Sequence, residues 1–441
     1  MTASLPIATS LVLVISLTYL AVVASCVLWM TLRHGARREQ AAEDLDTVAV
    51  SRFTIPVSLI VVANRETDDL SDAVKHLLAL NYPEFEVIVV SDAADRHLQV
   101  LKGSWELEAR EFFFRQALTT SPISRIYRSA SDKRLTLLIK EGTGRSDAIN
   151  CGVNVARFRY VGVVDARVRF DADALLRAMA AAQRDPATVV GVSSHVERSA
   201  TARDGFMAAF GRLASMRAIM ESRLVWRGLD GAVGPTDAVV IWRRDAVLGA
   251  GGFSTDAPNG TLDMMCRLQS SAEGPRHRVV RNPDVFGQAA TASLSEAMNE
   301  VRAREGAALA ILTAWLTRSS TGFRDRRIGT YVMLSEVATP VAQALAVLAS
   351  VSGSAAGWFP WWHSMAVLFI LSFGNAVVSS AALLLRGVSS GSPEGAETAR
   401  LLMLAPLDFL CYRPALAWAR ITGVWSAFKP SALRPAASAS R

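Results

Sequence analysis

Acidic and amide side chains follow three apolar runs that have the pattern of buried strands. Asn64 and Glu66 come after "PVSLIVVA", Asp92 ends "EVIVVSD", and Asp165 ends "YVGVVD". The carboxyl ends of parallel strands meet at one edge of an α/β sheet, and ligands of such sheets bind at that edge. The pattern predicts a binding site built from strand ends, although Asp and Asn are also common turn residues where no ligand binds.

The elements that position these residues are predicted between residues 52 and 327. Short β-branched runs alternate there with segments of helical spacing, such as "DLSDAVKHLLAL" and "DADALLRAMAAA". This alternation is typical of an α/β domain with a mostly parallel, Rossmann-like sheet. We therefore expect one α/β domain over residues 52–327.

An apolar segment precedes this domain. Residues 1–32 contain no charged residue, and Arg33, Arg37 and Arg38 follow them. At about 1.5 Å per helical residue the segment is long enough to cross a hydrocarbon core of roughly 30 Å. We expect residues 1–32 to be a transmembrane anchor rather than a cleavable signal peptide, and residues 33–51 to be a basic linker. The arginines place the amino terminus outside and the domain in the cytoplasm.

Further apolar segments follow the domain. Residues 328–387 predict two transmembrane helices, because a connector without Lys or Arg separates two apolar runs whose outer flanks carry arginines. Residues 388–441 predict an interfacial or membrane-associated segment and tail, because Asp408, Arg413 and Pro414 interrupt the apolar run. The predicted location is the inner (plasma) membrane, with several spans.

Composition argues against other classes of protein. The formal net charge is +7, and the arginines are spread along the chain, which favours attraction to a membrane surface over nucleic acid binding. The four cysteines have no paired spacing and the six histidines do not cluster, so neither a disulfide framework nor a zinc site is indicated.

Several motifs, in order and spacing, resemble those of membrane-embedded family 2 glycosyltransferases with a GT-A domain, which include cellulose, hyaluronan and poly-N-acetylglucosamine synthases. They are "VSLIVVANRE", "EVIVVSDAAD", "GTGRSDAINCGVNVARFRYVGVVDA", "VVIWRRDAVLGAGGF" and "TLDMMCRL". The resemblance covers almost the whole chain. It implies inverting hexosyl or N-acetylhexosaminyl transfer from a nucleoside diphosphate sugar, commonly UDP-linked, in cell-surface or extracellular polysaccharide (biofilm) synthesis. Implied partners are a glycan or lipid-linked acceptor, membrane lipid and other synthesis or export subunits.

The resemblance also implies which residues contact the nucleotide sugar. Arg145 stands where the family has a lysine, and its guanidinium can contact phosphate through two hydrogen bonds. The segment "VRAREGAAL" matches a motif that contacts the diphosphate and stacks on the acceptor sugar, but Glu305 replaces the aromatic residue. The implied contacts are Ala63, Asn64, Glu66, Asp92, Arg145, Asp147, Asn150, Arg302 and Arg304.

The chain departs from the family at the metal-binding motif. The family ends its third strand with two aspartates one residue apart, which hold a divalent cation, Mg or Mn, at the diphosphate. Asp165 keeps the first ligand, whereas Arg167 replaces the second. Three interpretations remain open. Arg167 could neutralise the diphosphate directly, without metal, or the site could have lost its chemistry, or Asp171 or Asp173 could supply the missing carboxylate.

The general base is the other point of departure. Asp263 matches the family's base, but Leu262 replaces the preceding glutamate and Arg267 lies four residues on. On a helix this spacing pairs Asp263 with Arg267, and an ion pair weakens a carboxylate as a base. Two hypotheses follow. One is a glycosyltransferase in which Asp263 is the base and Asp165 faces the diphosphate. The other is a catalytically inactive glycosyltransferase-like subunit or scaffold of a polysaccharide complex.

Overall fold

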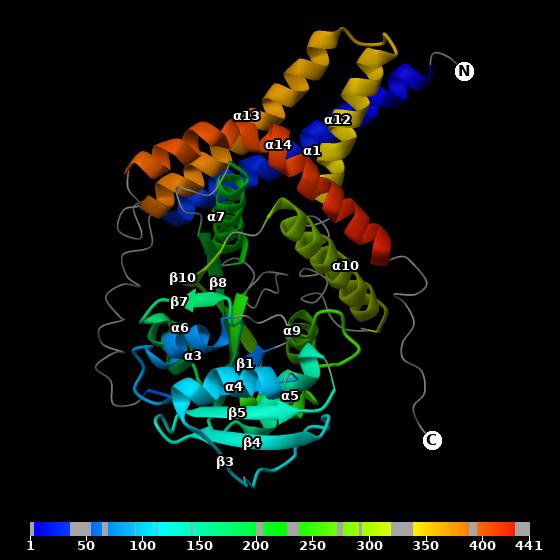
Figure 1. The fold of residues 1–441 in the computed structure, drawn as a ribbon. Coiled ribbons are helices and arrows are strands. Elements are labelled where there is room, and N and C mark those ends of the chain that lie inside the picture. Colours follow the sequence, from blue (N-terminus) through cyan, green and yellow to red (C-terminus); the bar gives the residue numbers. More distant parts are fainter. Residues whose placement is uncertain are drawn as a thin grey trace. The chain divides into compact units, whose positions relative to one another are not determined.

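The computed structural model describes residues 4–35, 54–63, 69–92, 94–111, 113–142, 144–199, 206–226, 238–270, 277–290, 293–318, 338–387 and 395–427. The chain forms two compact units (Figure 1). The sheet unit comprises Glu39–Glu197, Asp230–Ala290 and Ser438–Arg441. The helical unit comprises Met1–Arg38, Arg198–Leu229 and Thr291–Ala437.

A single sheet organises the sheet unit, with strand order β3-β4-β5-β2-β1-β6-β9-β8-β10-β7. The central strands β5, β2, β1 and β6 pair in parallel, as the apolar runs predict. Antiparallel pairs flank this centre. The strands are β1 (Val57–Ala63), β2 (Phe85–Ser91), β3 (Leu107–Ala109), β4 (Ile123–Ser129), β5 (Leu135–Lys140), β6 (Tyr160–Val164), β7 (Val168–Phe170), β8 (Val189–Ser199), β9 (Ala238–Arg243) and β10 (Arg278–Ala290).

The central strands are buried along almost their whole length because helices cover them. Every residue of β2, β5 and β6 is buried, which explains why these strands have continuous apolar runs rather than alternating ones. Residues of β1, β2, β5 and β6 share one core with α3 and α6. The helices are α3 (Leu70–Leu78), α4 (Ala94–Trp105), α5 (Arg145–Val155), α6 (Ala174–Arg184), α8 (Arg244–Gly249) and α9 (Gly260–Ser270).

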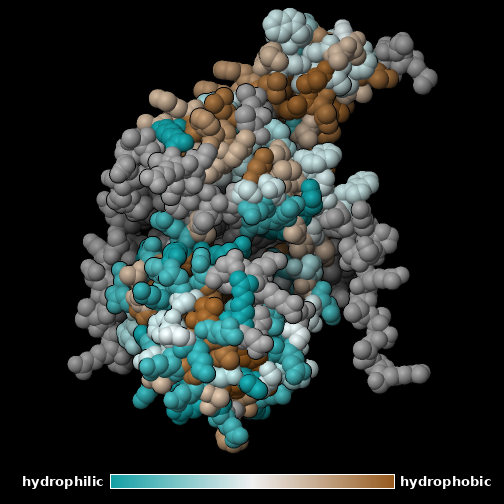
Figure 2. Space-filling model, in the orientation of Figure 1, coloured by the Kyte–Doolittle hydropathy of each residue, from teal (hydrophilic) through white to brown (hydrophobic). Residues whose placement is uncertain are grey.

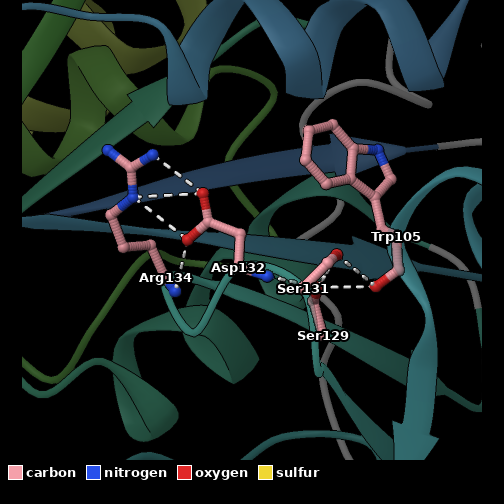
Figure 3. Close-up of polar contacts among 5 residues, drawn as sticks. All are labelled: Trp105, Ser129, Ser131, Asp132 and Arg134. Carbon is pink, nitrogen blue, oxygen red and sulfur yellow. Dashed lines mark hydrogen bonds and ion pairs between the residues drawn. The ribbon is translucent and has the colours of Figure 1, made fainter.

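The turn between β4 and β5 lies at the amino-terminal edge of the parallel strands (Figure 3). Asp132 accepts hydrogen bonds from the backbone nitrogen (2.9 Å), Nε (3.1 Å) and Nη2 (2.8 Å) of Arg134. Ser129 and Ser131 both donate to the carbonyl oxygen of Trp105 at the end of α4. These contacts close the turn and fasten it to α4.

The helical unit contains α1 (Ser4–Gly35), α7 (Phe206–Trp226), α10 (Leu294–Arg318), α12 (Thr339–Ala355), α13 (Trp361–Gly387) and α14 (Gly395–Ala427). Helix α14 packs on α7, α10 and α13, and α12 packs on α1 and α13. Two helices inside the expected domain 52–327, α7 and α10, thus belong to the helical unit. The other domain boundaries drawn from the sequence stay predictions.

Large apolar side chains are exposed mainly on the helical unit, where brown surface gathers on its helices in Figure 2. Examples are Leu11 on α1 (59 % exposed), Phe369 on α13 (68 %) and Met403 on α14 (78 %). In the described part of the sheet unit, the exposed large apolar residues are Val100 and Phe113.

One described helix, α1, is long and apolar enough to cross a membrane, over Leu5–Cys26. The two parts of α14, Ala399–Asp408 and Tyr412–Gly423, would add a second span if they count as one, although they are bent by 53°. The apolar stretches of α12 and α13, Val341–Ala355 and Trp361–Gly374, are shorter. Neither of these described stretches is long enough to count as a span, and residues 328–337 of the expected pair lie outside the described residues.

Candidate active site

Four neighbouring strands end at the same edge of the sheet, as the polar strand ends predict. Ala63 at the end of β1 lies opposite Ser91 of β2, and Ser91 lies opposite Ile139 of β5. On the other side of β1, β6 ends just before Asp165. Two predicted residues that follow β1, Asn64 and Glu66, lie outside the described residues.

Asp92, which follows β2, has a buried oxygen for which the described residues supply no hydrogen-bond partner. Its Oδ1 atom has almost no contact with solvent, although the residue as a whole is half-buried. A buried polar oxygen is costly to leave unpaired, so such an atom at a strand end is suited to accept a hydrogen bond from a ligand.

Helix α5 begins at this edge, directly after Gly144, whose φ of 130° lies in the region that favours glycine. Arg145, its first residue, is exposed. Asp147 is buried and accepts hydrogen bonds from Lys140 Nζ (2.6 Å) and from the backbone nitrogen of Ser121 (2.9 Å). Burial raises the pKa of Asp147, but these two donors outweigh it and hold the pKa below its ordinary value.

Lys140 is a residue that the sequence analysis missed. Its side chain is 1 % exposed and also donates to the carbonyl oxygen of Gly142 (2.9 Å), so it fixes the loop before α5. The available signal was a lysine at the end of the apolar strand "LTLLIK". Both hydrogen-bond partners named for Asp147 are groups of the protein itself. These contacts do not test its predicted contact with a nucleotide, which stays a prediction.

Asn150, on the next turn of α5, binds the backbone of Phe253. Its Nδ2 donates to the carbonyl oxygen of Phe253 and its Oδ1 accepts from the backbone nitrogen, both at 2.8 Å. Asn150 is 4 % exposed. In this arrangement it fastens α5 to the turn that precedes α9, and its predicted contact with a nucleotide also stays a prediction.

Asp165 and Arg167 form a forked ion pair. Oδ1 of Asp165 accepts from the backbone nitrogen (3.0 Å) and Nε (3.2 Å) of Arg167, and Oδ2 accepts from Nη2 (3.0 Å). Burial raises the pKa of Asp165, but the hydrogen bonds and charge of Arg167, together with the charge of Arg145, leave it below the ordinary value. Arg145 therefore lies close enough to act on Asp165.

The two aspartates expected as possible replacements for the second carboxylate each have a protein partner, and their role at a metal stays a prediction. Asp171 pairs with Arg177 Nη2 at 2.8 Å, and Asp173, the N-cap of α6, accepts from Asn81 Nδ2 at 2.8 Å. These contacts hold the start of α6.

Helix α9 carries the predicted base, and Asn259 caps it by accepting a hydrogen bond from the backbone nitrogen of Leu262 (3.1 Å). Asp263 Oδ2 accepts from Arg267 at 2.8 Å, so the pairing predicted from the four-residue spacing is present. A Cβ atom added to Gly260 would lie 2.7 Å from Oγ of Ser146, so the first turns of α9 and α5 are in close contact.

These residues do not fit a divalent cation held by a pair of carboxylates. Both oxygens of Asp165 accept hydrogen bonds from Arg167, and a guanidinium occupies the place of the second ligand. The described residues contain no group of three or more His, Cys, Asp or Glu that could hold a metal ion. The site instead has groups that suit an anion, namely the side chains of Arg145 and Arg167 and the amino termini of α5 and α9.

Arg302 and Arg304, the remaining predicted contacts, lie on α10 in the helical unit. Arg302 Nε donates to Oγ1 of Thr422 on α14 at 3.0 Å. Their role at a diphosphate stays a prediction. Glu305, which replaces the family's aromatic residue, is 2 % exposed and pairs with Arg420 of α14 at 3.5 Å.

A family model described as glycosyltransferase-like family 2 matches residues 55–308, more than half of the chain. The chain belongs to this family. No curated protein matches the sequence.

Solved structures that the chain matches include a mannosyltransferase from Pyrobaculum calidifontis in complex with GDP-Man and Mn²⁺. It is 17 % identical, with a TM-score of 0.49, and the match covers 88 % of this chain and 99 % of that one. Another is S. aureus TarS 1-349 in complex with UDP-GlcNAc, which is 12 % identical, with a TM-score of 0.35 and coverage of 84 % and 92 %.

Proposed function

We propose that this protein is a membrane-anchored glycosyltransferase that uses a nucleoside diphosphate sugar and neutralises the diphosphate with arginine instead of a metal ion. The forked pair of Asp165 and Arg167 carries this proposal. The guanidinium of Arg167 is held by Asp165 and is 83 % exposed, so it is both oriented and accessible to a ligand.

The charges around this pair support the same reading. The leaving group is a nucleoside diphosphate, whose negative charge grows as the sugar departs, and fixed donors stabilise that charge. Arg145 and Arg167 supply cations, and the amino termini of α5 and α9 add backbone N–H groups and favourable dipoles. The buried oxygen of Asp92, which has no hydrogen-bond partner in the described ranges, supports a nucleoside contact at the end of β2.

In the proposed reaction Asp263 is the general base. Oδ2 of Asp263 is paired with Arg267, whereas its Oδ1 makes no hydrogen bond in the described part of the chain, and the side chain is 22 % exposed. The carboxylate takes the proton of an acceptor hydroxyl, and that oxygen attacks the anomeric carbon as the bond to the diphosphate breaks. A single displacement of this kind inverts the anomeric configuration.

The proposed location is the inner membrane, with the sheet unit on the cytoplasmic side. Helix α1 and the exposed apolar side chains of α12, α13 and α14 support attachment to lipid. A role in polysaccharide synthesis, with a glycan or lipid-linked acceptor, agrees with this location and with the family.

The test is turnover of UDP-linked and GDP-linked sugars by the full chain in detergent, with and without EDTA. We expect turnover that persists in EDTA, falls by about 100-fold or more in Asp263→Asn, and falls by about 10-fold or more in Arg167→Gln. The matched control is Arg134→Gln, which removes the same kind of fork from the opposite edge of the sheet. Turnover that disappears in EDTA would contradict the role given to Arg167.

A second candidate function, a catalytically inactive subunit that binds nucleotide, is favoured by one observation. Three of the aspartates at the site are already paired with a cation, Asp147 with Lys140, Asp165 with Arg167, and Asp263 with Arg267. Under this alternative UDP or GDP would raise the unfolding temperature, while no donor would be hydrolysed or transferred.

A further inference from the structure

The turn between α8 and α9 is fastened from two sides. Gly251 and Gly252 both have a φ of +79°, and the carbonyl oxygens of Ala250 and Gly252 accept hydrogen bonds from Nη1 (2.5 Å) and Nη2 (2.7 Å) of Arg267. The next residue, Phe253, is held through its backbone nitrogen and oxygen by Asn150. Arg267 thus ties the turn to α9, and Asn150 ties it to α5.

The packing around the turn leaves little room for movement. Phe253 is 2 % exposed. A Cβ atom added to Gly252 would lie 2.8 Å from Oδ1 of Asn150 and 2.9 Å from Cδ1 of Leu118. Displacing the turn would therefore break hydrogen bonds to both helices at once.

Arg267 has a third partner in the same network. Its Nε donates to Oδ2 of Asp263 at 2.8 Å, so one planar guanidinium binds two backbone carbonyls and the proposed base. We infer that Arg267 is a positioning residue that fixes Asp263 relative to α5, through the turn at residues 250–253. This inference rests on the proposed function, because it assigns the base role to Asp263.

Loss of this network should affect turnover more than donor binding. Asp263 would gain rotational freedom, and small displacements of a reacting group reduce the rate of the chemical step strongly. Donor contacts proposed on α5 would keep their position, because Lys140 and Ser121 hold Asp147 independently. A lysine could not replace Arg267, because an ammonium lacks the planar fork that reaches three acceptors.

The experiment compares Arg267→Met and Arg267→Lys with the native chain in detergent. We expect kcat to fall by about 10-fold to 100-fold in both variants, while KM for the donor stays within about twofold, as expected when only transition-state interactions are lost. The inference is overturned if kcat is unchanged, or if the whole effect is an increase in KM.

Arg243→Met is the matched control for lost stability. Nε of Arg243 donates to Asp245 at 2.7 Å, and Nη1 donates to the carbonyl oxygens of Pro186 (3.2 Å) and Ala187 (3.0 Å). Arg243 thus binds one carboxylate and two backbone carbonyls, as Arg267 does, but it lies opposite Tyr160 at the amino-terminal edge of β6. We expect a lower unfolding temperature with normal kcat, and an equal fall in kcat would overturn the inference.

A second measurement tests the network without turnover. Arg267 and Asn150 hold the same turn. The double variant with Arg267→Met and Asn150→Leu should therefore lose less unfolding temperature than the sum of the losses in the two single variants. Arg267→Met combined with Arg134→Met, in the β4–β5 turn, should be additive. If the native chain has no transfer activity, the proposed function fails while this coupling still stands. Additive effects of Arg267→Met and Asn150→Leu would overturn the network itself.

Discussion

Arg167 donates three hydrogen bonds to Asp165, two residues before it, from its backbone nitrogen and from two guanidinium nitrogens. Arg134 binds Asp132 in the same way at the opposite edge of the sheet (Figure 3). The fork is therefore a local property of an Asp-x-Arg turn. Its role depends on the edge of the sheet at which the turn lies. At the β4–β5 turn it closes a connection, whereas after β6 it places a guanidinium at the carboxyl-terminal edge of the parallel strands.

Restoring the second carboxylate should restore metal binding. In Arg167→Asp the oxygens of Asp165 are no longer occupied by a guanidinium, and two carboxylates one residue apart suit a hard divalent cation. We expect the variant to bind Mn²⁺, measured by calorimetry or electron paramagnetic resonance, more tightly than the native chain. Arg134→Asp is the matched control and should bind no more Mn²⁺ than the native chain. Equal Mn²⁺ binding by both variants would contradict a metal site specific to the carboxyl-terminal edge of the sheet.

The buried pair of Lys140 and Asp147 should contribute strongly to stability. Their side chains are 1 % and 10 % exposed, and breaking such a pair typically costs about 3–5 kcal/mol. We expect Lys140→Met to lower the free energy of unfolding by an amount of this order, and Lys140→Met with Asp147→Asn to recover part of it, because no unpaired charge is then buried. A double variant as unstable as the single one would contradict this explanation.

The same pair predicts a pH dependence of stability. The pKa of Asp147 is lowered in the folded chain, so its contribution is present above the unfolded pKa and is lost as pH falls through the folded pKa. We expect that contribution to disappear below about pH 4. In Lys140→Met burial acts on Asp147 without its main donor, so the ionised carboxylate should destabilise the folded chain, and the free energy of unfolding should rise as pH falls and the carboxylate is protonated. Thermal unfolding of both proteins as a function of pH measures this difference.

Alanine substitutions at three glycines around the turn before α9 distinguish the effect of backbone strain from the effect of side-chain contact. Gly249→Ala should be nearly neutral, because nothing lies within 4 Å of an added Cβ and its φ is not positive. Gly251→Ala adds only the strain of a positive φ, about 1–2 kcal/mol. Gly252→Ala adds the same strain and displaces Asn150, so it should destabilise the chain most and lower turnover. Chemical denaturation and turnover assays measure the series, and equal effects at Gly251 and Gly252 would contradict the role of Asn150.

A buried ion pair joins α10 to α14 in the helical unit. Glu305 is 2 % exposed and Arg420 lies 3.5 Å from it, so Arg420→Met removes a cation from beside a buried carboxylate. We expect a lower unfolding temperature in detergent, partly recovered by adding Glu305→Gln. The control is Arg110→Met, which breaks an exposed pair with Glu108 and should change stability by less than about 1 kcal/mol. Similar effects of Arg420→Met and Arg110→Met would contradict a structural role for the pair.

Local patterns in the sequence were sufficient for the elements and for some of their polar residues. Continuous apolar runs identified β1, β2 and β6, and the polar residues after them marked the edge where Asp92 and Asp165 lie. The four-residue spacing predicted the pair of Asp263 and Arg267. These features follow from the periods of strands and helices, which are local properties of the chain.

The remaining features depend on which distant segments pack together. Asn150 binds Phe253, 103 residues away, and Asp147 binds the backbone of Ser121, so both residues that resembled ligand contacts also hold loops in place. Hydropathy predicted more membrane spans than the described helices support. The sequence by itself determined the family's strand ends and the exchange of a carboxylate for Arg167. Only the tertiary structure decided which partner each charge has, because long-range packing selects among the acceptors that each donor could reach.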